Sequence, residues 1–218
     1  QNALAAMGHA VTYAHRRARS PGAPAPAPDE RVIARWRTRL GEGRALAEHE
    51  ALTMVADFGV PTIPWRLAKD EGEAKAAAAA LGFPVALKTA EGLAHKTEVG
   101  GVHLGLTDGE AVARAWRDLR DRIGPRVLVM PMAEPGVEMA LGIVVDAQFG
   151  PLVMVGAGGI LVEAVPDRAY LLGATDTGRA TAAIDRLQAR RLLAGLRGRP
   201  AADVAALARA AVALGAMA

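Results

Sequence analysis

Apolar residues recur with two different periods along the chain, and their order predicts a mixed helix-and-sheet fold. Helical spacing predicts helices over residues 1–19, 45–58, 70–82, 107–122, 177–196 and 201–218. Alternating or continuous apolar runs predict strands over residues 83–89, 102–106, 126–132, 137–145, 152–155 and 160–165. The turn residues 146–151 join two of these strands as a hairpin. Long strands, a hairpin and covering helices indicate an α/β or α+β domain with two lobes.

Residues 20–30 predict a boundary between domains. Prolines alternate with small residues from Ser20 to Pro28, and proline fixes φ and removes a hydrogen-bond donor. We therefore expect an extended, semi-rigid linker. The preceding helix, residues 1–19, places Leu4 and Met7 on one face. A helix isolated before a linker indicates the last piece of another domain, so the main domain is expected over residues 31–218.

The segment from Phe83 to Leu106 carries the densest candidate chemistry. Its first strand closes on Lys88, and the loop that follows carries His95, Lys96 and Thr97 ahead of a Gly-Gly pair. A lysine ammonium supplies a point charge for phosphate, and a neutral imidazole can carry a phosphoryl group. Taken alone, these residues equally allow a β-loop-β connection with solvated side chains.

Two further segments give weaker signals. Residues 130–138 fit either a hinge whose backbone groups pair with a purine edge or an ordinary strand-loop-strand. The loop from Gly156 to Gly159 fits either a phosphate cradle or a tight turn, since it matches neither the dinucleotide fingerprint nor the Walker A pattern. The remaining histidines lack the spacing of metal ligands, so no metal site is predicted.

Composition excludes several functional classes. The 218 residues are 51% hydrophobic and contain no cysteine, which excludes disulfides, thiolate metal sites and cysteine nucleophiles and favours a cytoplasmic location. Net charge is +3, and the basic residues are scattered apart from short groups such as residues 31–44. This pattern indicates a solvated surface rather than a nucleic-acid face. The longest uncharged apolar run, residues 149–162, is too short and glycine-rich to span a membrane.

Three segments together resemble a known family. They are KTAEGLAHKTEVGGVHLGL, VLVMPMAEPGVEMALGIVVDAQFGPLVMVGAGGILVEAV and LLAGLRGRPAAD. The chain resembles, from about Leu46 onward, the ATP-grasp domain of ADP-forming acyl-CoA synthetases (the acetate–CoA ligase family), which is related to the succinyl-CoA synthetase β subunit. The resemblance implies a two-lobed ATP-grasp fold, truncated at its C-terminus and preceded by the terminal helix of a flavodoxin-like CoA-ligase domain.

The resemblance also implies a reaction, the reversible conversion of acyl-CoA, ADP and phosphate into acid, CoA and ATP. His95 matches the histidine that accepts the phosphoryl group on a mobile loop. ATP or ADP is the implied cofactor, and the implied nucleotide-binding residues are Lys88, Lys96, Thr97, Met130, Met132, Ala133, Glu138, Gly158 and Gly159. The implied partner is a CoA-ligase domain, upstream or in a partner subunit, that binds CoA and a small carboxylic acid. An oligomer is expected, with no nucleic-acid or membrane partner.

The chain departs from the family pattern at several positions. The magnesium ligands of the family lie in a segment expected beyond Ala218, so the metal site is expected to be incomplete here. Met130 and Pro131 replace the usual polar pair at the hinge, and the family's arginine near Leu171 is missing.

Two alternatives to the enzyme remain open. Protein lysine acetyltransferases contain a similar region as a regulatory ligand-binding module, which the missing arginine favours and the retained His95 and Lys88 disfavour. The other alternative is a degenerate partner subunit that fails to bind nucleotide.

Overall fold

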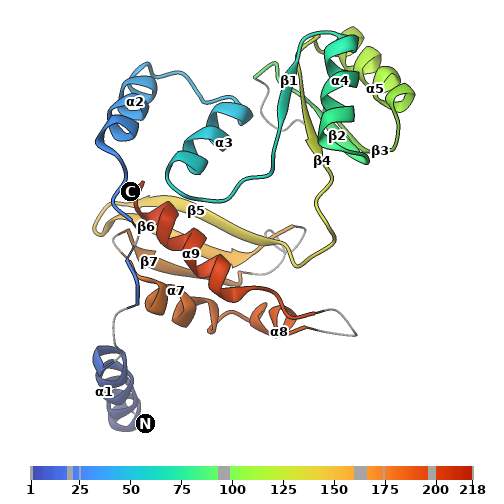
Figure 1. Ribbon diagram of the computed structural model, residues 1–218. Coiled ribbons are helices and arrows are strands. Elements are labelled where there is room, and N and C mark those ends of the chain that lie inside the picture. The colour runs from blue at the N-terminus through green and yellow to red at the C-terminus, as the bar shows by residue number, and fades with distance from the viewer. Residues whose placement is uncertain are drawn as a thin grey trace. The chain divides into compact units, whose positions relative to one another are not determined.

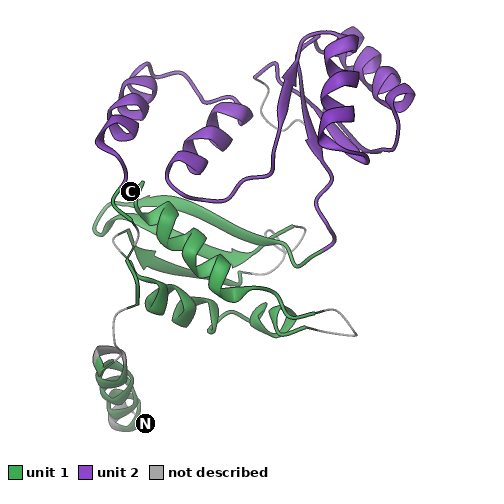
Figure 2. Cartoon of the chain, in the orientation of Figure 1, with its two compact units in different colours: residues 1–27, 136–218 green, residues 28–135 purple. Residues whose placement is uncertain are grey.

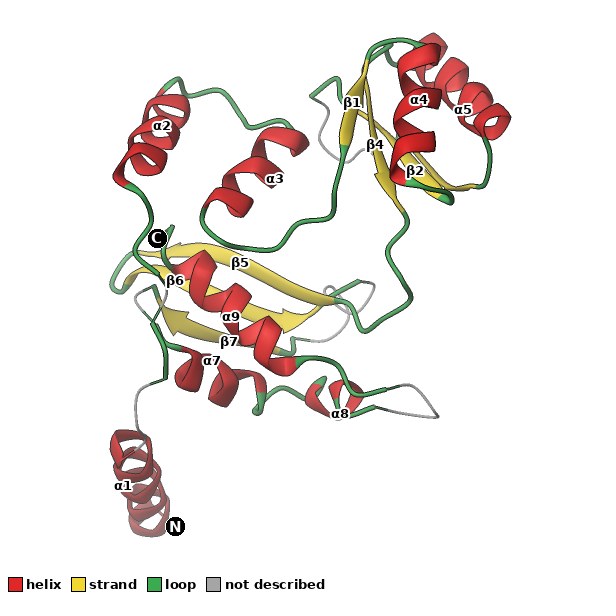
Figure 3. Cartoon of the chain, in the orientation of Figure 1, coloured by secondary structure: helices red, strands yellow, loops and turns green. Residues whose placement is uncertain are grey.

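The chain folds into two compact units, each with its own antiparallel sheet. The computed structural model describes residues 2–18, 22–24, 26–92, 99–159, 166–173, 175–195 and 200–217. One unit, called unit 1, comprises residues 1–27 and 136–218; unit 2 comprises residues 28–135 (Figure 2). Both units combine helices with strands, as Figure 3 shows, which confirms the predicted fold class.

Unit 2 contains a four-stranded sheet with two helices on one face. The strands occur in the order β1-β4-β2-β3 and every pair is antiparallel. Helices α4 and α5 pack against these strands (Figure 1). The elements are β1 (Arg66–Ala68), α4 (Glu71–Leu81), β2 (Val85–Thr89), β3 (Val102–Leu106), α5 (Gly109–Arg122) and β4 (Val127–Pro131).

The core of unit 2 follows from the helical and strand periods of its sequence. Helix α5 buries Val112, Ala115, Trp116 and Leu119, which lie three or four positions apart and so share one face. Helix α4 contributes only small buried side chains, all alanines. Leu87 is fully buried in the same cluster.

Carboxylates start both of these helices. Asp70 accepts a hydrogen bond from the Glu73 backbone N–H at 2.8 Å, which confirms the predicted start of α4. The predicted start of α5 at Thr107 is wrong by one residue, because Asp108 occupies the N-cap and accepts from the Ala111 N–H at 2.8 Å. A carboxylate is a stronger acceptor for the exposed N–H groups than the neighbouring hydroxyl.

Unit 2 begins with two helices, α2 (Glu30–Gly41) and α3 (Glu48–Asp57). The sequence predicted α3 but not α2, whose arginines hide the apolar stripe; Trp36 is its only buried residue. Trp36 Nε1 donates to Asp57 Oδ2 at 2.8 Å, and Arg35 forms an ion pair with the same carboxylate. The basic stretch over residues 31–44 therefore pairs partly with acidic groups of its own unit.

Unit 1 contains the predicted hairpin and a third strand. Its sheet has the order β5-β6-β7, from β5 (Met139–Asp146), β6 (Gly150–Ala157) and β7 (Arg168–Leu172). Asp146 closes the hairpin by accepting from the Gln148 and Phe149 N–H groups at 2.8 and 3.0 Å. Strand β7 was not predicted, and the strand predicted over residues 160–165 lies outside the described residues.

The C-terminal part of unit 1 is helical, and the helix predicted over residues 177–196 begins at Thr177 as expected but is not continuous. It is divided into α7 (Thr177–Ile184) and α8 (Arg190–Leu193). The buried Asp167 carboxylate accepts from the Gln188 and Ala189 N–H groups, each at 2.8 Å, and holds the intervening turn. Helix α9 (Val204–Gly215) packs with α7 and against β5 and β6 (Figure 1).

The N-terminal segment of unit 1 consists of helix α1 (Asn2–Ala18) and a docked linker. The Gly22 N–H donates to Asp176 Oδ1 at 2.9 Å, and the Ala23 N–H donates to Thr177 Oγ1 at 3.1 Å. A Cβ at Gly22 would lie 2.3 Å from the Gly178 nitrogen, so this approach requires glycine. Within the described part of the chain, no helix combines the length and apolarity needed to cross a membrane.

We expect Leu87→Ala to lower the free energy of unfolding by about 2–5 kcal/mol, because it leaves a cavity in the core of unit 2. Urea denaturation followed by circular dichroism measures this change. Leu104→Ala in β3 is the matched control, because Leu104 is 62% exposed and its loss should cost less than about 0.5 kcal/mol. Equal losses in the two variants would contradict this assignment of the core.

Candidate functional site

Lys88 lies on the face of the unit 2 sheet opposite to helices α4 and α5. Successive side chains of a strand point to opposite faces. Val85, Leu87 and Thr89 of β2 are buried, and the first two belong to the helix-covered core. Lys88 must therefore point to the other face, where its register partner on β4 is Leu128.

Met130 shares that face with Lys88. It pairs with Ala86, two residues before Lys88 on β2, so Met130 and Lys88 are diagonal neighbours on adjacent strands. Met130 and Leu128 are buried, whereas Lys88 is only half-buried. The arrangement is one half-buried ammonium beside buried apolar side chains of β4, and it supplies a single positive charge for an anionic group.

Glu48 contacts Lys88 from a distant part of the sequence. Lys88 Nζ donates to Glu48 Oε1 at 2.7 Å, although the two residues are 40 positions apart. Glu48 is the first residue of α3, in unit 2 like Lys88. Sequence reasoning missed this contact, because an acidic residue in the first turn of a helix is already explained by the helix dipole.

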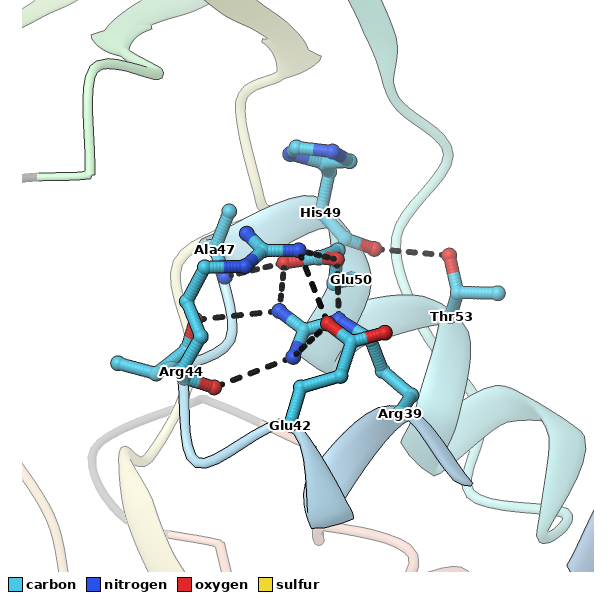
Figure 4. Close-up of polar contacts among 8 residues, drawn as sticks. Arg39, Glu42, Arg44, Ala47, His49, Glu50 and Thr53 are labelled. Carbon is cyan, nitrogen blue, oxygen red and sulfur yellow. Dashed lines mark hydrogen bonds and ion pairs between the residues drawn. The ribbon is translucent and has the colours of Figure 1, made fainter. Parts of the chain in front are cut away.

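The start of α3 is held in place by an arginine on α2 (Figure 4). Arg39 donates from Nε and Nη2 to the two oxygens of Glu50, each at 2.8 Å. Its guanidinium also donates to the Arg44 and Ala45 carbonyls at 3.1 and 3.2 Å. These hydrogen bonds from Arg39, together with one from the Ala47 N–H, lower the pKa of Glu50 to about 2.

Two arginines hold the chain on either side of residues 93–98. On the strand β2 side, Arg126 donates to the Glu91 carboxylate at 2.8 Å and lowers its pKa. On the strand β3 side, Arg122 donates to the Val99 and Gly100 carbonyls at 3.4 and 2.9 Å. The flanks of the segment that carries His95 are therefore fixed to α5 and to the start of β4.

Asp118 links Arg122 to a histidine on β3. It accepts from Arg122 Nε at 2.9 Å and lies 2.8 Å from His103 Nε2. The hydrogen bonds from Arg122 and then His103 lower the pKa of Asp118 to about 2. The sequence predicted a strand over residues 102–106 and a helix over residues 107–122, but gave no signal that His103 and Asp118 meet.

Glu138 and the glycines after β6 form a separate cluster in unit 1. The Gly158 N–H donates to the Glu138 carbonyl at 2.8 Å. Gly159 has φ +58°, and a Cβ there would lie 2.0 Å from Glu138 Oε2. Only glycine combines this backbone conformation with so close an approach of the carboxylate.

The structure groups the predicted site residues into two sets, one in each unit. Lys88 and Met130 lie together on the sheet of unit 2, and the exposed Met132 and Ala133 follow at the end of β4. The second set contains Glu138, Gly158 and Gly159. The predicted residues His95, Lys96 and Thr97 lie outside the described residues.

Among the described residues, no three or more His, Cys, Asp or Glu side chains lie close enough together to hold a metal ion.

Comparison with known proteins gives one match to a family model. Residues 38–218 match the model of an ATP-grasp domain. Among curated relatives, the chain is 32% identical over 187 residues to "Acetate--CoA ligase [ADP-forming] II subunit beta" of Pyrococcus furiosus, covering 82% of this chain and 77% of that protein. It is 31% identical over 178 residues to "Acetate--CoA ligase [ADP-forming] I" of Archaeoglobus fulgidus, covering 78% of this chain.

The chain spans only 26% of the length of the Archaeoglobus fulgidus enzyme. A solved structure of the dinucleotide forming acetyl-coenzyme A synthetase 1 of Ca. Korarchaeum cryptofilum is similar, with a TM-score of 0.73 and 35% identity. The match covers 83% of this chain and 82% of that one. That protein is in complex with coenzyme A and Mg-AMPPCP, and its phosphohistidine segment points towards its nucleotide binding site.

We expect Glu50→Gln to lower the melting temperature by about 2–4 °C at pH 6, because it removes the charged partner of Arg39. A carboxyl whose pKa is lowered from 4.5 to about 2 stabilises the fold above pH 4.5 and loses this contribution as the pH falls towards 2. The difference between wild type and variant should therefore shrink between pH 5 and pH 2.5, as measured by thermal unfolding.

Glu42→Gln is the control for this measurement. Glu42 lies 3.5 Å from Arg39 and is half exposed, so its substitution should change the melting temperature less. A Glu50→Gln difference that is independent of pH would contradict the proposed charge state.

Proposed function

Since the chain belongs to the ATP-grasp domain family, we propose that it is the nucleotide-binding and phosphoryl-transfer part of an ADP-forming acyl-CoA synthetase. The complete enzyme would interconvert acyl-CoA, ADP and phosphate with acid, CoA and ATP. Relatives named as ADP-forming acetate–CoA ligases support this activity.

Lys88 is the observation that carries the proposal. Its ammonium lies beside the apolar strip of Leu128 and Met130, on the sheet face that α4 and α5 leave uncovered. In the proposed function Lys88 holds nucleotide phosphates as a point charge. Met130, Met132 and Ala133 contact the adenine.

Other predicted residues complete the proposed nucleotide contacts. Lys96 and Thr97 are assigned to the phosphates by the resemblance to the family. Glu138 is assigned to the nucleotide together with Gly158 and Gly159. The close approach of Gly159 to the Glu138 carboxylate limits the positions that this side chain can adopt.

His95 is proposed as the phosphoryl carrier. A neutral ring nitrogen of His95 attacks the phosphorus held by a histidine of the CoA-ligase part, forming one N–P bond as the other breaks. An oxygen of the ADP β-phosphate then attacks the same phosphorus, and the His95 N–P bond breaks to give ATP. Such transfers need alignment and positive charge more than acid–base catalysis, and Lys88 supplies a charge of this kind. The phosphohistidine segment of the Ca. Korarchaeum cryptofilum protein supports this role.

The CoA-binding part is proposed to lie outside residues 31–218. One relative is named as a separate β subunit and another is nearly four times as long as the matched region, which supports either a partner subunit or an upstream part of the same chain. Helix α1 exposes Leu4, Met7 and Val11 along one face, which suits the end of an upstream CoA-ligase domain. Magnesium is proposed to enter with the nucleotide.

Incubation of the full chain with γ-labelled ATP and Mg²⁺ tests this proposal. We expect acid-labile, base-stable protein label in the wild type and loss of the label in His95→Ala. His9→Ala, which changes an exposed histidine of α1, should retain full labelling. Persistence of the label in His95→Ala would refute the carrier role.

Lack of label in the wild type, with ATP binding intact, would contradict the phosphoryl-transfer proposal. It would indicate a ligand-binding module of the kind found beside lysine acetyltransferases.

Gly159→Ala should weaken ADP binding about tenfold or more, because the new methyl group displaces the Glu138 carboxylate. Isothermal titration calorimetry measures the affinity. Gly150→Ala is a matched control, since Gly150 also has positive φ, +71°, but has open space around the position of a Cβ. Both variants bear a similar backbone strain, so equal ADP affinities in the two would show that the Glu138 contact is irrelevant to binding.

A further inference from the structure

The ion pair between Lys88 and Glu48 is better shielded from water than the other lysine ion pairs of the described residues. The Lys88 and Glu48 side chains are 29% and 26% exposed. The side chains of the Lys69–Glu73 pair are 74% and 43% exposed, and those of Lys75–Glu110 are 40% and 70% exposed. Water and salt therefore screen the Lys88–Glu48 pair less than the two more exposed pairs.

Glu48 reaches Lys88 from a backbone that is held in position. It opens α3, where the helix dipole favours a negative charge. The next acidic residue, Glu50, is bound by Arg39 and by the Ala47 N–H at 2.8 Å (Figure 4). The turn that carries Glu48 is therefore fixed to α2. Because this backbone is already ordered, holding the Glu48 carboxylate beside the sheet costs little further backbone entropy.

A nucleotide phosphate bound at Lys88 would meet this carboxylate. Glu48 Oε1 already accepts from the ammonium at 2.7 Å, and a phosphate oxygen needs a similar distance to the same nitrogen. Two anions that bind one ammonium lie within about 3–6 Å of each other and repel. Phosphate and Glu48 therefore compete for the charge of Lys88.

We propose that Glu48 is the counter-ion of Lys88 in the nucleotide-free chain and a competitor of the nucleotide phosphates. Binding exchanges a carboxylate for a phosphate at Lys88, so Glu48 lowers the affinity for nucleotide. This inference rests on the proposed function, because it takes Lys88 as the phosphate-binding cation. A competitor of this kind favours release of nucleotide in both directions of a reversible reaction.

Calorimetric titration of the full chain with ADP and with adenosine tests the proposal. Glu48→Gln keeps the length of the side chain and one acceptor oxygen but removes the charge. We expect ADP to bind about threefold to tenfold more tightly to this variant, and adenosine, which has no phosphate, to bind unchanged. Glu48→Ala should change ADP binding in the same direction, and Glu48→Asp should retain wild-type affinity.

Glu110→Gln is the matched control. It removes a carboxylate that lies 2.8 Å from another lysine of unit 2, Lys75, on the helices of the opposite sheet face. ADP affinity should be unchanged in this variant. If Glu48→Gln and Glu48→Ala, folded by circular dichroism, bind ADP no more tightly than wild type, Glu48 is not a competitor.

Lys88→Met separates this inference from the proposed function. Weaker ADP binding in Lys88→Met together with unchanged binding in Glu48→Gln would overturn the Glu48 inference alone. Unchanged ADP binding in Lys88→Met would overturn both, because Lys88 would then not bind phosphate.

Discussion

The burial of Val85 and Leu87 in the helix-covered core decides on which face of the sheet Lys88 lies. Val85, Leu87 and Thr89 are fully buried. Because successive side chains of a strand point to opposite faces, Lys88 points to the other face of the sheet. A slip of one residue in the pairing of β2 with β4 would place an ammonium in an apolar core. The hydrophobic energy of the α4 and α5 interface therefore also fixes the position of the charge. The same packing therefore both stabilises unit 2 and places the lysine on which the proposed nucleotide binding depends.

The features predicted correctly from sequence have short-range causes. The α4 cap at Asp70 and the β5–β6 hairpin closed by Asp146 depend on residues within a few positions of each other. Family resemblance supplied the site residues, but only the register of β2 and β4 shows that Lys88 and Met130 are neighbours. Helix α2 was missed because its arginines interrupt the apolar pattern, and the contacts of Arg35 and Trp36 with Asp57 join residues about twenty positions apart.

Contacts between distant segments were beyond the reach of local pattern. Asp167 interrupts the predicted C-terminal helix from 21 and 22 residues away, at Gln188 and Ala189. Glu48 meets Lys88 across 40 residues. In both cases the local sequence around the carboxylate gives no sign of its partner. The hydrogen bond forms only because the fold brings a distant donor to the carboxylate, and helical or strand periodicity does not predict such long-range contacts.

The docked linker of unit 1 has a consequence for whatever accompanies helix α1. The proline-rich composition predicts an extended, semi-rigid linker over residues 20–30, and Gly22 and Ala23 of this segment are hydrogen-bonded to Asp176 and Thr177 at the start of α7. Only four peptide units separate Ala18 from Gly22, and a fully extended chain of that length spans about 14 Å. The tether between α1 and the hydrogen-bonded residues Gly22 and Ala23 is therefore short. A domain attached through α1 would be confined to a small volume around the N-terminus of α7, and its local concentration there would be set by the covalent geometry of those few residues.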